Sequence, residues 1–148
     1  MPTLKALFDP RPRVSAPVYR RDVLRAALAA AVLICLAVWL GGQGWRSAAI
    51  GAVAPIVPAA LVVLSRTAGR LRDRDRTPWL LAVYGILYVV SLAPIEDLAD
   101  TYPVETLASA LAILAFFVWF FVETWLRAGT PGPNRFGPPP VETPVASM

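Results

Sequence analysis

Four long apolar runs separated by short charged blocks constrain the fold of this 148-residue chain more than any other feature. The runs cover residues 23–40, 48–64, 79–94 and 104–127. A helix of about 20 apolar residues crosses the hydrocarbon core of a bilayer. Hydrophobic residues make up 57% of the chain, above the roughly 45–50% of an ordinary soluble domain. The sequence therefore predicts an all-α integral membrane protein with four transmembrane helices, antiparallel and joined by short loops.

The segments outside the runs divide the chain into three parts. Residues 1–22 form a basic arm whose prolines disfavour helix. Residues 23–127 form the transmembrane domain, and residues 128–148 form a proline-rich tail that we expect to be extended in water. Pro55 and Pro58 lie inside the second run, where they predict a kink and the packing of that helix inside the bundle.

The loop between the second and third runs determines the expected orientation. Residues 65–79 contain five arginines and two aspartates. Thirteen of the fourteen lysine and arginine residues lie in this loop, in the arm and the tail, or next to them at Arg25 and Arg127, and only Arg46 falls on the opposite side. Because basic residues are enriched on the cytoplasmic side of membrane proteins, we expect both termini to be cytoplasmic.

The same loop supplies the candidate binding residues, which are Arg70, Arg72, Arg74 and Arg76. Guanidinium groups bind phosphate and carboxylate oxygens through paired hydrogen bonds, so these side chains suit anionic lipid head groups or a protein partner. Nucleic acid is disfavoured as a partner because the basic residues adjoin apolar runs. The alternative is that the loop only sets the topology and forms exposed ion pairs of about 0–1 kcal/mol each.

Residues that carry catalysis or bind metals are scarce. The chain has no histidine and a single cysteine, Cys35, inside the first apolar run. The segment between the third and fourth runs is acidic, with the carboxylates Glu96, Asp97, Asp100 and Glu105. These residues lack the ligand spacing and the glycine of a calcium loop, which favours a solvated loop. Since no nucleophile lies beside a recognisable base, we expect no enzymatic activity, no cofactor and no metal site.

Glu123 is the one acidic residue inside an apolar run. An ionisable residue within a transmembrane helix raises the hypothesis of a transport or proton-carrying role. Glu123 lies near the cytoplasmic end of the fourth run, and Arg127 follows four residues later in the order that favours a helical ion pair. We therefore predict a pair whose side chains extend to the membrane interface.

Two stretches of the sequence carry a family resemblance. Residues 70–79, RLRDRDRTPW, resemble a signature R-L-H-D-x-G-R-S-G-W and match it at Arg70, Leu71, Asp73, Arg76 and Trp79. Residues 129–140, GTPGPNRFGPPP, resemble an ending G-T-P-G-x-N-R-Y-G-P. Residues 19–24, YRRDVL, are more weakly similar to S-R-R-E-Y-W before a first helix. The chain thus resembles the domain of unknown function 805 family of small bacterial inner-membrane proteins.

The loop also departs from the family signature. Arg72 stands where the family has histidine, and Asp75 and Pro78 stand where it has glycine. The missing histidine puts in doubt any proton-linked or metal-linked role at that position. The resemblance implies a multi-pass protein of the bacterial inner membrane whose biochemical activity the family itself does not establish.

The predicted topology places the loop and the tail on the same face of the membrane. Both also carry the family resemblance, which suggests a structural link between them. We hypothesise that Asp73 accepts a hydrogen bond from Asn134 or Arg135 and so holds the tail against the loop. This hypothesis gives the loop a structural role beside its candidate role in binding.

The function that these features favour is a non-enzymatic scaffold or adaptor. It would present the basic loop and tail to anionic membrane lipids or to a protein partner. The alternatives are a small oligomeric transporter or channel and an accessory subunit of a membrane enzyme complex. The sequence leaves open whether the chain forms a homo-oligomer.

Overall fold

The computed structural model describes residues 12–140, and within that range the protein is helical, with no β-strand. The helices are α2 (Ala16–Gly42), α3 (Arg46–Val53), α4 (Ile56–Asp73), α5 (Leu80–Ser91), α6 (Glu96–Thr101) and α7 (Pro103–Phe121). A single turn of π-helix, η1 (Val122–Leu126), continues α7. An isolated β-bridge joins Asn134 and Gly137 in the tail.

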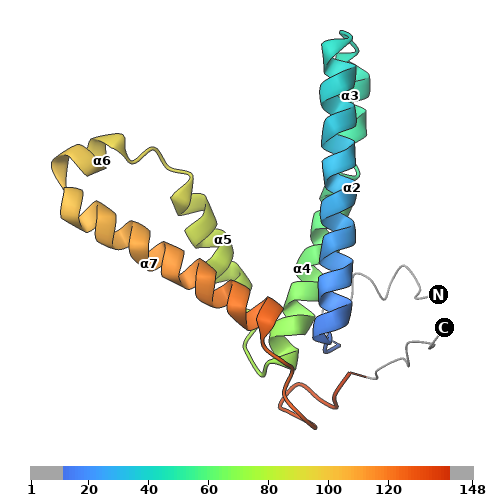
Figure 1. Ribbon diagram of the computed structural model, residues 1–148, viewed down its shortest axis with the longest axis vertical. Helices are drawn as coiled ribbons and strands as arrows, with labels where there is room; N and C mark the ends of the chain where they lie inside the picture. The colour runs from blue at the N-terminus through green and yellow to red at the C-terminus, as the bar shows by residue number, and fades with distance from the viewer. Residues whose placement is uncertain (1–11, 141–148) are drawn as a thin grey trace.

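The helices form two hairpins that meet at one end of the molecule and diverge from there (Figure 1). In the first hairpin, α2 packs along α3 and α4. In the second, α5 contacts α7, and α6 bridges their far ends. The hairpins contact each other where α2 and α4 reach η1. That meeting point places the loop after α4 and the tail after η1 next to each other.

Glycine and proline set the turn and the break in the first hairpin. The chain reverses after α2 at Gly44, whose φ of +82° is a conformation that glycine adopts readily. Pro55 separates α3 from α4, because its ring removes a backbone donor and clashes with the preceding turn. The predicted kink therefore appears as a break in the helix. The expected packing inside a bundle is not found, since α3 contains no buried residue.

Several helix boundaries differ from those expected from hydropathy. Helix α2 begins at Ala16, inside the expected arm, because Pro17 lies in the first turn, where proline's fixed φ suits a helix. Helix α4 continues past the apolar run to Asp73, since nothing in this polar stretch interrupts a helix. Helix α5 ends at Ser91, three residues before Pro94. Residues 1–11 and 141–148 of the expected arm and tail lie outside the described range.

Three helical segments are long and apolar enough to cross a membrane: Ala16–Gly42, Arg46–Asp73 and Pro103–Leu126. The fourth apolar helix, α5, has 12 residues and is therefore about 18 Å long at 1.5 Å per residue. A bilayer core is ~30 Å thick. The described chain thus contains three long apolar helices and one short apolar helix instead of four of similar length.

Burial is concentrated at the end where the hairpins meet. Helix α5, like α3, contains no buried residue. The single buried residues of α2 and α7 are Tyr19 and Phe120. The buried residues of α4 all fall between Ser65 and Asp73. The arms of the two hairpins consequently expose most of their apolar side chains, whereas their common base is packed.

Candidate functional site: an arginine-rich junction

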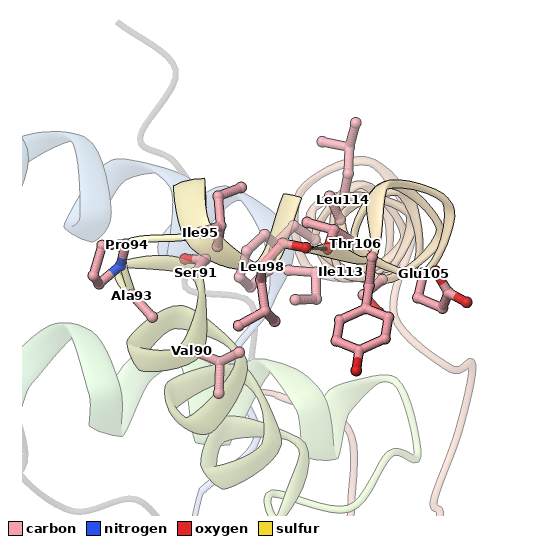
Figure 2. A pocket seen from close by; sticks show the side chains of 14 residues that line it. Val90, Ser91, Ala93, Pro94, Ile95, Leu98, Glu105, Thr106, Ile113 and Leu114 are labelled. Atoms are coloured by element: carbon pink, nitrogen blue, oxygen red, sulfur yellow. Dashed lines mark hydrogen bonds between the residues drawn. The ribbon is translucent and has the colours of Figure 1, made fainter. Parts of the chain in front are cut away.

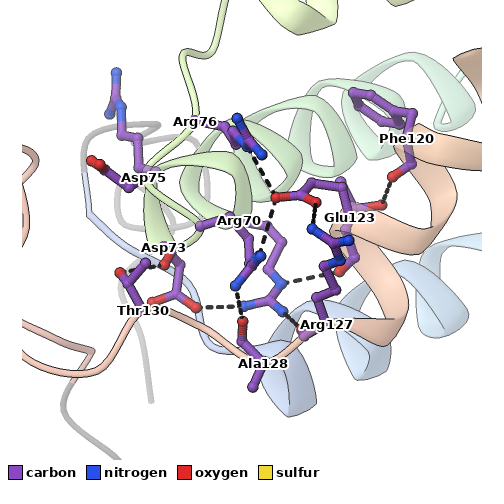
Figure 3. A network of polar contacts seen from close by, with 12 residues as sticks. Arg70, Asp73, Asp75, Arg76, Phe120, Glu123, Arg127, Ala128 and Thr130 are labelled. Carbon is purple, nitrogen blue, oxygen red and sulfur yellow. Dashed lines mark hydrogen bonds and ion pairs between the residues drawn. The ribbon is translucent and has the colours of Figure 1, made fainter.

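The base of the two hairpins is held by a network of charged side chains, which we call the junction (Figure 3). Its members are Arg13, Arg20, Arg70, Asp73, Arg74, Arg76, Glu123 and Arg127. They come from the segment before α2, from α2 itself, from α4 and the loop after it, and from η1 and the residue that follows it. The two carboxylates are buried, and each is the acceptor for more than one arginine.

Asp73 is the first of these centres. Arg13 donates from Nε and Nη2 to Asp73 Oδ1, over 3.2 and 3.0 Å. Arg70 donates from Nη1 to Asp73 Oδ2. All three side chains are almost completely removed from solvent. A buried charge is tolerated only when it is paired and hydrogen-bonded, so this arrangement depends on every partner.

Glu123 is the second centre, and its side chain has no exposed surface. Its Oε1 accepts from Arg74 Nε at 3.2 Å and from Arg76 Nε at 3.1 Å. Its Oε2 accepts from Arg127 Nη1 at 3.1 Å. The i,i+4 partner expected from the sequence is present, but the carboxylate does not extend to the surface. Arg74 and Arg76 enclose it because the end of α4 lies beside η1.

The widened turn η1 supplies further acceptors. The last carbonyls of a helix lack intrahelical donors and carry the negative end of the helix dipole. Arg20 of α2 donates from Nε to the Trp125 carbonyl at 2.7 Å, and Arg70 of α4 donates from Nε to the Thr124 carbonyl at 3.0 Å. Arg70 also donates to the carbonyl of Arg127. Arginines of the first hairpin therefore cap the last helix of the second.

The tail continues this network along the end of α4. Thr130 donates from both its backbone nitrogen and its hydroxyl to the Asp73 carbonyl, each at 2.8 Å. Asn134 donates from Nδ2 to the Arg72 carbonyl at 2.8 Å. Arg135 pairs with the side chain of Asp75 at 3.1 Å. The loop and the tail are thus in direct contact.

The specific pairing expected for Asp73 differs from the observed one. Its carboxylate binds Arg13 and Arg70, and neither Asn134 nor Arg135 reaches it. Arg13 also donates to the carbonyls of Gly132 and Thr130 in the tail. Sequence reasoning missed Arg13 because it lies among prolines in a segment expected to be solvated. Its proximity to Asp73 follows from the fold alone.

Two glycines allow the close approach of these segments. A Cβ at Gly69 in α4 would lie 2.6 Å from Val14 Cγ2 and 2.7 Å from the Pro12 carbonyl oxygen. A Cβ at Gly129 would lie 2.8 Å from Cγ of Asp73. Real Cβ atoms essentially never make contacts under 3.0 Å. The glycines therefore let the segment before α2 and the tail pack directly on α4.

The four arginines expected to bind lipid or a partner have different environments. Arg70 is completely buried, so it has no surface to offer a ligand. Arg74 is mostly buried against Glu123. Arg72 is partly buried, with its guanidinium 5.8 Å from the centre of the Phe136 ring, and Arg76 is about half exposed. The loop is therefore first an internal structural element, and only part of it faces outward.

Some arginines at the same end of the molecule are exposed, including two members of the junction, Arg76 and Arg127. Two belong to α2, and three belong to the loop, the residue after η1 and the tail. This exposed arginine set consists of Arg21, Arg25, Arg76, Arg127 and Arg135. As for metal ions, no group of three or more histidine, cysteine or acidic side chains comes together among the side chains that the structure describes.

The apolar helices and the buried ionic junction define a multi-pass helical membrane protein. More specifically, the chain belongs to the family described as Protein of unknown function (DUF805), which matches residues 7–138. The resemblance seen in the loop and tail motifs is thereby confirmed, and the match includes every residue of the junction. Comparison with curated proteins and with solved structures gives no match.

Proposed function

We propose that the protein is a non-enzymatic scaffold of a bacterial cytoplasmic membrane, with four membrane crossings and both termini in the cytoplasm. An even number of crossings is supported by the meeting of the two ends of the described chain, where Arg13 binds the carbonyls of Gly132 and Gly137. The cytoplasmic assignment of that end is supported by its charge, since Arg46 is the one basic residue at the far turn.

In this proposal the exposed arginine set faces the anionic head groups of the inner leaflet. The observation that carries it is the division of the arginines at one end of the molecule. The arginines of the junction are engaged by buried carboxylates and carbonyls, whereas Arg21, Arg25 and Arg135 lie outside the junction and are exposed. Arg21 and Arg25 are both exposed and lie one turn apart on α2. In this proposal the guanidinium groups of both residues bind lipid phosphates beside the junction.

The rigid junction gives these exposed arginines a fixed spacing. Arg21 lies directly beside Arg20, which is hydrogen-bonded to the Trp125 carbonyl, and Asp22, which pairs with Arg66 of α4 at 3.1 Å. The backbone of α2 is therefore anchored on both sides of Arg21. A scaffold of this kind organises head groups or an acidic partner without changing their covalent structure.

The test is retention of lipid in native mass spectrometry of the full chain. The protein would be released from nanodiscs that contain equal amounts of phosphatidylglycerol and phosphatidylcholine. We expect preferential retention of phosphatidylglycerol by the wild type. A basic residue near an anionic membrane surface contributes about 1 kcal/mol, so the double variant Arg21→Gln, Arg25→Gln should bind this lipid roughly 30-fold more weakly.

The matched control is Arg46→Gln, which removes an exposed arginine at the opposite end. It should leave the retention of anionic lipid at the cytoplasmic end unchanged. Equal retention of both lipids by the wild type, or the same loss in the control as in the double variant, would overturn the proposal. Neutralising Arg70 is unsuitable as a test of binding, because it removes a buried contact of the junction.

A further inference from the structure

A groove of about 620 Å³ lies between α5, α6 and α7, at the end of the second hairpin far from the junction (Figure 2). Its volume falls within the roughly 300–1,000 Å³ of small-molecule sites. Most of its lining is apolar, including Val90, Leu98, Ile113 and Phe117. Figure 2 shows Val90, Leu98 and Ile113 gathered around the same space from three different helices. The groove is therefore shaped for an apolar chain.

The short length of α5 creates this space. Helix α5 ends at Ser91, and residues 92–95 and α6 then cross to the start of α7. Irregular backbone at membrane depth occurs where it is buried in protein or lines a cavity. Ala93, Pro94 and Ile95 all line the groove. The departure from a full-length third helix thus coincides with this apolar groove.

The charges near the groove have a single sign. The sequence contains no lysine, arginine or histidine from Thr77 to Leu126. Glu105, in the first turn of α7, lies at the rim and is the one charged residue among those that line the groove. Ser109 and Thr106 add hydroxyl oxygens to the same lining. The polar groups of the groove are therefore suited to a hydrogen-bond donor that carries positive charge.

We propose that this groove binds an amphiphile that has a primary ammonium head and a single apolar chain. The chain lies against Val90, Leu98 and Ile113, where it replaces contacts with bulk lipid. The ammonium group offers three N–H donors, which the Glu105 carboxylate and the Ser109 hydroxyl accept at the rim. An anionic head group is disfavoured there because no cation of the protein lies within the lining.

The test is photolabelling of the full-length protein in phosphatidylcholine nanodiscs. The probe is a twelve-carbon primary alkylamine with a diazirine at the end of its chain, and mass spectrometry of peptides locates the label. We expect labelling within residues 90–117 that is saturable and is competed by unlabelled dodecylammonium. A matched alkyl sulfate probe should label these peptides at least several-fold less. Equal labelling by both probes, or labelling spread evenly over all helices, would overturn the proposal.

Two variants separate the head-group contact from the groove itself. Glu105→Gln should raise the half-saturating concentration of the amine about three- to fivefold, which corresponds to the loss of one ion pair of up to about 1 kcal/mol. Glu96→Gln removes a carboxylate of α6 outside the lining and should leave labelling unchanged. Ala110→Phe should abolish saturable labelling because it fills the groove. An unaltered half-saturating concentration in Glu105→Gln would contradict the assigned head-group site.

Glu105 also lies where an acidic residue stabilises the start of a helix. The thermal unfolding midpoint of each variant is therefore measured alongside labelling. An unchanged midpoint in Glu105→Gln, together with labelling by the amine that reaches the wild-type maximum at saturating probe, would show that the groove persists. A higher half-saturating concentration of the amine in that variant then reports the lost contact and supports the proposal.

Discussion

The junction and the apolar arms of the hairpins are stabilised in opposite ways. The junction buries charged side chains and pairs them with groups of opposite charge. Glu123, for example, pairs with three arginines. The arms leave large apolar side chains uncovered, among them Leu28 and Val38. In a bilayer the exposed apolar surface is solvated by lipid, so packing between helices brings little hydrophobic gain. Lipid chains do not solvate charged groups, so charged side chains need hydrogen-bonding partners or counter-charges within the protein.

The internal contacts of the protein lie where its sequence is polar. Soluble domains concentrate their stability in an apolar core, whereas here the apolar arms have almost no buried residues. Substitutions at polar positions of the junction should therefore destabilise the fold most, and substitutions in the arms least.

The largest effect is expected for Arg70→Ala. Arg70 is completely buried and donates to Asp73 and to the carbonyls of Thr124 and Arg127. Removing one partner of a buried ion pair costs about 3–5 kcal/mol. We expect the variant to unfold at a lower temperature in detergent by a wide margin. An exposed arginine, Arg25→Ala, serves as the control, and equal shifts in the two variants would mean that the junction is not the stabilising centre.

A smaller but still clear effect is expected for Gly69→Ala. Alanine favours helix over glycine by about 0.5–1 kcal/mol, but at this position its Cβ would lie 2.6 Å from Val14 Cγ2. Overpacking costs about 1–3 kcal/mol, so the net change should be destabilising. Gly85 of α5 is the matched control, since a Cβ there would have no atom within 4 Å apart from its chain neighbours and the backbone of its own helix. Thermal unfolding should show Gly85→Ala unchanged or stabilised, and the same sign in both variants would contradict the close approach.

Thr130→Ala should loosen the tail more than it destabilises the helices. Its hydroxyl donates to the Asp73 carbonyl at 2.8 Å and accepts from Arg13 and Asn134. Loss of such hydrogen bonds costs about 1–2 kcal/mol. Limited proteolysis should cleave the tail faster, whereas Thr106→Ala, at the far end of the second hairpin, should not change that rate. An unaltered cleavage rate in Thr130→Ala would show that the tail is held by other contacts.

The smallest effect is expected for Leu111→Ala in the middle of α7. Leu111 is exposed, so lipid or detergent surrounds it before and after unfolding within the membrane. The change in free energy of unfolding should stay within about 0.5 kcal/mol, in contrast to the 2–5 kcal/mol of a buried Leu→Ala substitution in a soluble core. A cost near that upper range would reveal that another protein surface covers α7.

The helices and the junction differ in how far the sequence predicts them. Hydropathy located the apolar segments, because a helix that crosses a bilayer needs a long run of apolar residues, and such runs are visible in the sequence. The partner of Glu123 at Arg127 was predicted because both lie on one helix turn. Its partners Arg74 and Arg76 were not predicted, because the distance between these arginines and Glu123 depends on how α4 crosses η1.

The contact between loop and tail was likewise predicted only in part from the sequence. The expected topology brings the two motifs together, and the structure shows them in contact, but topology says nothing about which atoms meet. Asp73 offers its carboxylate to Arg13 and Arg70 and its backbone carbonyl to Thr130. Backbone acceptors and the carbonyls exposed by η1 have no signature in side-chain chemistry. They become predictable only once the path of the backbone is known.

The junction also has a consequence for the order in which the chain is made. Arg70 leaves the ribosome 54 residues ahead of its acceptor, the carbonyl of Thr124. At about 5–20 residues per second, that interval lasts roughly 3–10 s. Until then Arg70 has its neighbour Asp73 but not the second hairpin. The carbonyls of Thr124 and Trp125 complete the network, so a nascent chain that stops before η1 lacks these acceptors of Arg70 and Arg20. Completion of the junction thereby distinguishes a chain that includes η1 from one that stops before it.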